Sequence, residues 1–164
     1  MKNLSQHAEK CIRELQRLNI PIRRVSKWTV SKRMTKCYGM CKLNKDGEFT
    51  ITVSDKLLQD NIDDFPLENT IVHELLHTIN MKDGHGGEWS TWAGWVNHKL
   101  KYKVYEYANY SKYGVHLNNR EYKYQVYCPC CHTAKRYKTK GKVIKNIENY
   151  ICSDCGSQLL VKEI

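Results

Sequence analysis

The chain has 164 residues, a net charge of +10 and a mean hydropathy of −0.66. This length suits one domain, or one domain with a small appendage, and the lack of a long apolar run excludes a transmembrane helix. Residues 1–10 lack the apolar segment of a secretory signal peptide. In such a chain, eight cysteines predict metal ligands and reduced thiols rather than disulfides. We therefore expect an intracellular protein that does not bind membranes.

Positive charge flanks the middle of the sequence. Residues 1–60 contain 13 Lys and Arg against 6 Asp and Glu, and residues 101–150 contain 11 against 3. Residues 61–100 contain 2 against 6. This distribution suits a polyanion that binds beside the middle segment, although ordinary solubilising charge would give similar counts.

The first sixty residues predict mixed α and β structure. Apolar periodicity and β-branched residues indicate one helix and then three strands, over residues 4–18, 22–30, 35–43 and 48–54. Pro21 marks the end of the helix, and Asp46-Gly47 predicts a hairpin turn between the last two strands. Cys37 and Cys41 would face the same side of one strand. We interpret them as small core residues in preference to a metal-binding pair.

Further helices are expected after residue 54. Ser54 and Asp55 can cap a short helix, and Pro66 fits the first turn of a longer one that ends near residue 81. Another helix is predicted over residues 88–100, where three tryptophans mark or adjoin the apolar face. We interpret Trp89, Trp92 and Trp95 as core residues in preference to a binding surface.

The segment His73-Glu74-Leu75-Leu76-His77 is an HExxH motif, which is typical of zinc hydrolases. On a helix, histidines four residues apart project from one face, so both can bind one Zn²⁺ ion. Glu74 would activate water as the general base. Apolar residues around the motif predict a helix that is backed by the core and has one polar edge at a cleft.

A catalytic zinc site needs a third protein ligand and an open fourth position. His85 is the preferred third ligand because it follows the expected end of the helix and lies among the glycines of residues 84–87. Glycine allows the sharp return of the chain that would bring His85 to the metal. The competing candidates are Glu88, Asp83 and His98, of which His98 is better explained as a surface residue on the next helix.

Four cysteines near the C-terminus form two CxxC pairs separated by twenty residues: Cys128, Cys131, Cys152 and Cys155. This spacing is typical of a closed, tetrahedral, structural zinc site of the zinc-ribbon type. Cys130 is an alternative ligand, but the two-residue spacing favours the pairs named. Residues 135–145 would form the hairpin between the two pairs. Because few apolar residues lie there, we expect this tail to unfold without metal.

Residues 101–127 contain eight of the eleven tyrosines, mixed with Lys and Arg. Aromatic faces beside cations are typical of proteins that bind single-stranded nucleic acid. Alternatively, these tyrosines pack a sheet and shield the second zinc site. The residues are Tyr102, Tyr105, Tyr107, Tyr110, Tyr113, Tyr122, Tyr124 and Tyr127.

These motifs together resemble the SprT-like (Spartan-type) zinc metalloproteases. The resemblance covers most of the chain and rests on residues 34–41, 51–54, 57–58, 70–77 and 85–89. By position, it implies that His73, His77 and His85 are zinc ligands and that Glu74 is the catalytic base. Many SprT-like chains also end in a zinc ribbon.

The resemblance implies a zincin-like α+β fold, with helices on a short sheet and the HExxH helix at the floor of a cleft. We expect a metalloprotease domain over residues 1–120 and a zinc ribbon over 121–164, with one catalytic and one structural zinc ion. Characterised eukaryotic members cut proteins that are covalently attached to DNA, and DNA activates them. The implied partners are therefore a protein substrate and DNA, and the tyrosines favour single strands.

Three functions are compatible with the sequence. The first is a zinc metalloendopeptidase that acts on proteins on or near DNA, including DNA–protein crosslinks. The second is a nucleic-acid-binding zinc protein with a non-catalytic HExxH site, which the intact Glu74 argues against. The third is a metal-dependent hydrolase of a non-peptide bond. A Glu74→Gln variant separates the first two, because it should retain the metal and lose only the chemistry.

Overall fold

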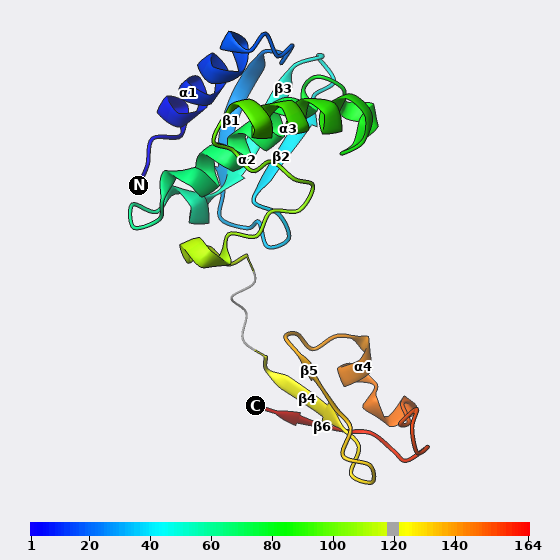
Figure 1. Cartoon of the computed structure of the whole chain (residues 1–164). Helices are drawn as coiled ribbons and strands as arrows, with labels where there is room; N and C mark the ends of the chain where they lie inside the picture. The colour runs from blue at the N-terminus through cyan, green and yellow to red at the C-terminus, as the bar shows by residue number, and fades with distance from the viewer. Residues whose placement is uncertain (118–121) are drawn as a thin grey trace. The chain divides into compact units, whose positions relative to one another are not determined.

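The structure, a computed structural model, describes residues 1–117 and 122–164 (Figure 1). The chain divides into two compact units, Met1–Asn118 and Asn119–Ile164. The domain boundary predicted between residues 120 and 121 lies outside the described residues. Each unit combines a small sheet with helical segments, so the fold is mixed α/β. None of the helices in the described part of the chain has the length and apolar character needed to cross a membrane.

The described part of the first unit contains three strands and three α-helices. In chain order they are α1 (Leu4–Arg17), β1 (Val25–Ser31), β2 (Gly39–Leu43), β3 (Phe49–Ser54), α2 (Asp64–His77) and α3 (Gly87–Lys99). Short 3-10 turns lie over Asp55–Leu58, Met81–Asp83 and Ser111–Tyr113. The predicted first helix, the first strand and the β-hairpin are confirmed, although β1 and β2 begin later than predicted.

The sheet of the first unit has the strand order β1-β3-β2, with β3 parallel to β1 and antiparallel to β2. On β3, the side chains of Phe49, Ile51 and Val53 are buried. Thr50 and Thr52 point to the opposite face and remain half-buried. This alternation is typical of a sheet that packs on a core with one face only.

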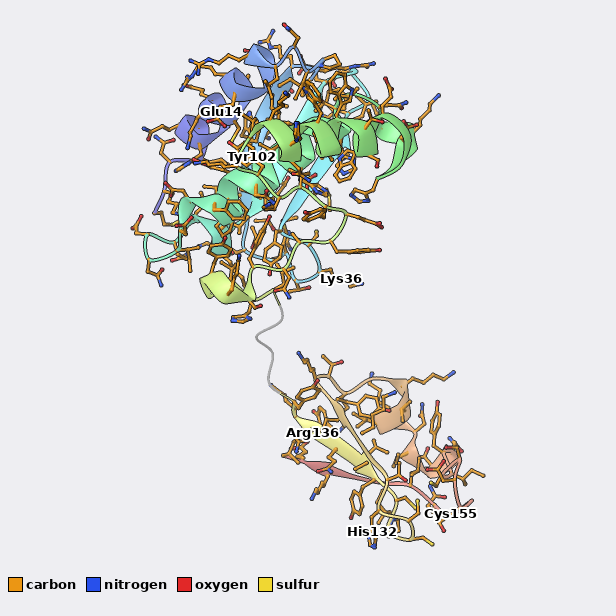
Figure 2. All side chains as sticks on the ribbon, viewed as in Figure 1. Glu14, Lys36, Tyr102, His132, Arg136 and Cys155 are labelled. Carbon is orange, nitrogen blue, oxygen red and sulfur yellow. The ribbon has the colours of Figure 1, made fainter. Side chains whose placement is uncertain are left out.

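Helix α2 lies at the centre of the first unit, where it packs against α1, α3, β2 and β3 (Figure 1). Ten of its fourteen residues are buried. Helix α1 contributes Cys11 and Leu15 to the same core. Tyr102 is fully buried, and its hydroxyl donates a hydrogen bond to Glu14 on α1 (Figure 2). Helix α2, which contains HExxH, is therefore held on several sides.

Three predictions about the first unit were wrong. Helix α2 ends at His77 rather than near residue 81, because Thr78 caps it and donates its hydroxyl to the carbonyl of Leu75 at 2.6 Å. Cys37 precedes β2 and is exposed, so it is not a core residue. Trp95 is 44% exposed and also lies outside the core, whereas Trp89 is buried as predicted.

The second unit contains a three-stranded sheet with the order β5-β4-β6. Its elements are β4 (Tyr124–Tyr127), β5 (Ala134–Tyr137), the short helix α4 (Lys142–Lys145) and β6 (Leu160–Glu163). Both pairings of β4 are antiparallel. The hairpin predicted over residues 135–145 was wrong, since the strand ends at Tyr137 and α4 follows. Ile144 of α4 is buried.

Candidate metal centre

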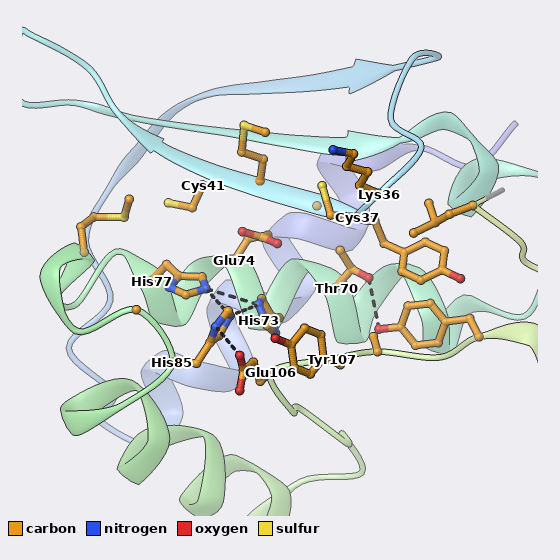
Figure 3. A pocket seen from close by; sticks show the side chains of 18 residues that line it. Lys36, Cys37, Cys41, Thr70, His73, Glu74, His77, His85, Glu106 and Tyr107 are labelled. Carbon is orange, nitrogen blue, oxygen red and sulfur yellow. Dashed lines mark hydrogen bonds and ion pairs between the residues drawn. The ribbon is translucent and has the colours of Figure 1, made fainter. Parts of the chain in front are cut away.

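Helix α2 and the loop after it bring three histidines together (Figure 3). The Nε2 atoms of His73 and His77 are 3.3 Å apart, and each is 3.1 Å from Nε2 of His85. Three nitrogen ligands at about 2.0–2.1 Å from one tetrahedral zinc ion are separated by about 3.3 Å. The three histidines are therefore placed as a zinc site requires.

The loop returns His85 to the helix through backbone conformations that favour glycine. Gly84 has a φ of 57° and Gly87 a φ of 45°, both in the region that L side chains rarely adopt. Asp83 supports this loop, because its Oδ2 accepts a hydrogen bond from the backbone N–H of Glu88 at 3.0 Å. Asp83, Glu88 and His98, the competing candidates for third ligand, lie outside the histidine group.

The electrostatics of the site favour the neutral forms of His73 and His77. Burial and the rings of His77 and His85 lower the pKa of His73 to about 3. Burial and the ring of His85 lower the pKa of His77 to about 4. The Nδ1–H of His73 donates to the backbone carbonyl of Tyr105 at 3.1 Å, which leaves the Nε2 lone pair directed at the centre of the group. Glu106 Oε1 lies 3.9 Å from Nδ1 of His85.

Trp89 on α3 packs against all three histidines. Its ring centroid is 4.9 Å from that of His73, 5.5 Å from that of His77 and 4.7 Å from that of His85. The Trp89 indole N–H also donates to the carbonyl of His73 at 3.4 Å. Trp89 is therefore both a core residue, as predicted, and the wall that limits movement of the three imidazole rings.

Two asparagines hold the segment that supplies the Tyr105 carbonyl. Asn69 on α2 accepts a hydrogen bond from the N–H of Lys103 at 2.7 Å and donates to its carbonyl at 3.1 Å. Asn97 on α3 does the same for Val104, at 2.7 and 2.8 Å. Sequence reasoning missed both residues, because neither belongs to a motif. The partner of Asn69 is 34 residues away in the chain, and the partner of Asn97 is seven residues away, beyond the end of α3.

Glu74 lies under β2, next to the histidines, and is only 6% exposed (Figure 3). Burial raises its pKa to about 8, although a hydrogen bond from the backbone of Cys41 opposes this shift. The carboxyl group fits there because Gly39 has no side chain, since a Cβ atom at Gly39 would be 2.5 Å from Glu74 Oε1. Gly39 was also missed by sequence reasoning.

A cavity of about 480 Å³ opens beside the histidines and Glu74. Helix α2 forms one wall with His73, Glu74 and His77, and the edge strand β2 forms the opposite wall. The rest of the lining comes from loop segments and includes Lys36, Cys37, Met81, His85, Glu106, Tyr107 and Leu117. The three histidines and Glu74 thus line a cavity in the first unit.

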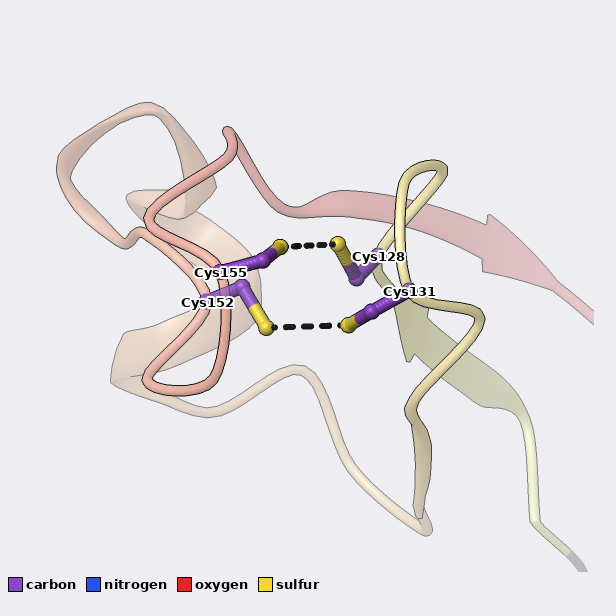
Figure 4. Close-up of side chains that lie close together, drawn as sticks. All are labelled: Cys128, Cys131, Cys152 and Cys155. Carbon is purple, nitrogen blue, oxygen red and sulfur yellow. Dashed lines mark hydrogen bonds between the residues drawn. The ribbon is translucent and has the colours of Figure 1, made fainter.

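The four predicted cysteines of the second unit also converge (Figure 4). The Sγ atoms of Cys128 and Cys155 are 3.4 Å apart, as are those of Cys131 and Cys152. Hydrogen bonds from Ser157 lower the pKa of Cys155 to about 6, which favours a metal-binding thiolate. The group fits a structural zinc ribbon.

The two CxxC turns have matching backbone structure. The N–H of His132 bonds to the carbonyl of Cys128, and the N–H of Gly156 bonds to the carbonyl of Cys152, at 3.1 and 2.8 Å. His132 and Gly156 both have a positive φ, of 62° and 73°. Cys130 is exposed and lies outside the group of four.

A third ionisable cluster joins α1 to the first half of α2. Glu68 Oε1 is 3.0 Å from His7 Nδ1 and 2.6 Å from Lys10 Nζ, and Asp64 is 2.8 Å from Lys2 Nζ. Burial opposes ionisation of Glu68, but hydrogen bonds from Lys10 and His7 lower its pKa. Because lysines already neutralise both carboxylates, the cluster acts as an anchor between the helices and not as a metal site.

Comparison with known protein families gives a match, and it covers the elements that form the histidine site. The family model of the SprT-like family matches residues 3–113, which include α1, the sheet, α2, the His85 loop and α3. A search of curated proteins found no significant match. The matched segment covers most of the chain, and the chain belongs to the SprT-like family.

Proposed function

We propose that this chain is a zinc-dependent metalloendopeptidase with a zincin-like active site in its first unit. His73, His77 and His85 hold the catalytic zinc ion, and Glu74 is the general base. The observation that carries the proposal is the convergence of three Nε2 atoms within 3.3 Å of one another beside a buried carboxyl group. A second, structural zinc ion is held by the four clustered cysteines.

The residues around the cavity have separate tasks. A bound zinc ion would act as a Lewis acid. It would polarise the scissile carbonyl and lower the pKa of a water molecule bound to it. Glu74 takes a proton from the attacking water and passes it to the leaving amine. A pKa near neutrality suits a group that both accepts and donates a proton, and burial moves the pKa of Glu74 in that direction. Tyr105 and Trp89 hold the histidine rings in place.

Strand β2 is the proposed guide for the substrate chain. It is an edge strand, so one side of its backbone is not paired within the sheet. Gly39, Met40 and Cys41 of this strand line the cavity beside Glu74. An extended peptide can add to such an edge through main-chain hydrogen bonds. This arrangement favours unfolded or flexible segments of a protein substrate.

We further propose that the protein substrate lies on or near DNA, including DNA–protein crosslinks. The tyrosines of residues 101–127 separate into a buried and an exposed class. Tyr102 and Tyr110 are buried in the core of the first unit, whereas Tyr107 is 84% exposed. In the second unit, the Nζ atom of Lys138 lies 5.1 Å from the ring centroid of the exposed Tyr122. Exposed tyrosines beside cations support contacts with single-stranded nucleic acid.

The decisive experiment compares the zinc-loaded protein with its Glu74→Gln variant on an unfolded protein substrate, with and without single-stranded DNA. We expect the variant to retain zinc and to lose about 10²–10⁴-fold in cleavage rate, the usual contribution of a general base. The matched control is Glu88→Gln, which makes the same change outside the histidine group. Cleavage that does not depend on Glu74, with or without DNA, would contradict the peptidase mechanism.

Stimulation by DNA tests the second part of the proposal. Glu74-dependent cleavage that rises with single-stranded DNA supports a DNA-coupled protease. Glu74-dependent cleavage that is the same with and without DNA supports the peptidase proposal. It contradicts the interpretation that the basic segments bring the enzyme to its substrate through DNA. If zinc and DNA both bind and no cleavage depends on Glu74, the protein is a nucleic-acid-binding zinc protein instead.

A further inference from the structure

The β1-β3-β2 sheet carries positive charge that the metal centre does not use. Residues 21–54 contain eight Lys and Arg and only two acidic residues. Within the described residues, none of these eight cations forms an ion pair. Lys36 lines the cavity, and the other seven are Arg23, Arg24, Lys27, Lys32, Arg33, Lys42 and Lys45.

Strand register places two of these lysines in one row on the outer face of the sheet. Lys27 of β1 is opposite Thr50 of β3, and Lys42 of β2 is opposite the same threonine. The strand spacing separates the two lysine Cα atoms by about 10 Å, and both side chains are exposed. In the next row, the hydroxyls of Thr29 and Thr52 are 2.7 Å apart. The outer face thus presents hydroxyl and ammonium groups.

The remaining cations border both ends of this face. Val25 and Leu43 are both opposite Phe49, so the start of β1 lies at the same end of the sheet as the β2–β3 turn. Residues 23–24 and Lys45 therefore lie at one end. Lys32 and Arg33 directly follow β1 and lie at the other end. Both acidic residues of the segment, Asp46 and Glu48, lie in the β2–β3 turn.

We infer that this outer sheet face, formed by Lys27, Lys42, Thr50 and the bordering cations, binds the phosphate backbone of duplex DNA. The two described rows, which contain Lys27, Thr50 and Lys42 and then Thr29, Thr52 and Met40, have no aromatic side chain on which an unpaired base could stack. Duplex DNA carries one charge per about 1.7 Å of axis, about twice the density of a single strand. A cationic face whose two described rows contain no aromatic side chain therefore favours duplex DNA.

This inference rests on the proposed function in one respect, namely the proposal that the protein acts on or near DNA. Thr50 and Thr52 point away from the side of the sheet on which Ile51 packs into the core. The outer face meets the cavity at Met40, on the edge strand β2. Contacts to phosphates position a protein without reading sequence. The outer sheet face would hold the first unit near a DNA-bound substrate and leave the cavity open.

The test uses the zinc-loaded full chain and its Lys27→Gln/Lys42→Gln variant. Affinities for a duplex and for a single strand of equal length are measured by fluorescence anisotropy over a salt series. We expect the variant to bind the duplex at least about tenfold more weakly at about 0.1 M salt. The slope of log K against log salt should fall by about 1.8, or about 0.9 for each phosphate contact. Binding of the single strand should change by less than about twofold.

The matched control is Arg17→Gln/Lys99→Gln, which removes the same charge from exposed positions on α1 and α3. This control should bind the duplex like the parent protein. The inference is overturned if the parent does not bind duplex DNA, if the sheet variant keeps the parental affinity and slope, if the control loses as much, or if single-strand binding falls equally. Glu74-dependent cleavage of an unfolded protein is measured in parallel, with and without single-stranded DNA. Its absence under both conditions contradicts the peptidase proposal and leaves the duplex-binding result unaffected.

Discussion

Gly39 and Glu74 are in close contact, although they lie on different elements. A Cβ atom at Gly39 would be 2.5 Å from Oε1 of Glu74 and 2.7 Å from its Cγ. Strand β2 therefore passes over Glu74, the proposed general base, and presents only backbone atoms to it at Gly39. The absence of a side chain at this position allows Glu74 to be buried and still remain beside the histidines.

The first prediction concerns Gly39→Ala. The new methyl group should displace the Glu74 carboxyl group and lower kcat about 10²-fold, the usual effect of a displacement of about 1 Å. The histidines are not moved, so bound zinc should remain at the parental level. The control is Gly94→Ala, because a Cβ at Gly94 meets no atom within 4 Å. Parental kcat in the zinc-loaded Gly39→Ala variant would show that Glu74 does not need this space.

The clustering of the candidate site residues could be predicted from local sequence, because these residues are close together in the chain. His73, Glu74 and His77 share one helical turn, and His85 follows through a glycine-rich loop. The cysteine pairs are also defined by local spacing. In contrast, Gly39 and Asn69 act through contacts with residues far away in the chain. Asn97 contacts Val104, seven residues later, but belongs to no motif. Neither periodicity nor motif spacing reveals such contacts.

The errors have a related origin. Cys37 was assigned to a strand because the pattern of residues 35–43 does not show where the ladder begins, and the structure starts β2 at Gly39. Trp95 was assigned to the core by residue type, but it lies on the exposed side of α3. The parallel pairing of β1 with β3 also could not be predicted, since strand signals do not specify partners.

The second prediction concerns Asn69, which holds Lys103 and thereby the segment that carries the Tyr105 carbonyl. Asn69→Ala should weaken zinc binding about 10–100-fold, as is typical when a residue that supports a metal ligand is removed. Competition with a chromogenic chelator measures the affinity. The control is Asn109→Ala, which removes an amide whose side-chain hydrogen bonds, among the described residues, are to Ser111. Equal zinc affinities of the two variants would contradict the role given to Asn69.

The third prediction concerns the second unit, which should unfold when its metal is removed. Its described core is small, so the free energy of metal binding should provide most of its stability. A strong chelator or Cys128→Ser should therefore make residues 122–164 sensitive to protease. Cys130→Ser should leave this unit resistant, because Cys130 lies outside the cysteine group. A protease-resistant 120–164 fragment in chelator would refute the prediction.

The fourth prediction is a pH dependence of the metal-free first unit. His73 and His77 have folded pKa values of about 3 and about 4, against about 6.5 in an unfolded chain. Below pH 6.5 the unfolded state therefore binds more protons at these sites, and the free energy of unfolding falls as the pH falls. The slope is at most about 1.4 kcal/mol per pH unit for each histidine, and partial exposure reduces it.

Glu74 has the opposite effect on the same protein. Its folded pKa of about 8 lies above the unfolded value, so its contribution to stability is lost as the pH rises from about 4.5 through about 8. Metal-free stability should thus be greatest near pH 6.5 and fall on both sides. The free energy of unfolding can be measured by urea unfolding in the presence of chelator. Tryptophan fluorescence reports on the first unit, because all four tryptophans lie there. Glu74→Gln should abolish the decline above pH 6.5 and keep the acid one. An unchanged alkaline decline in that variant would assign it to another group.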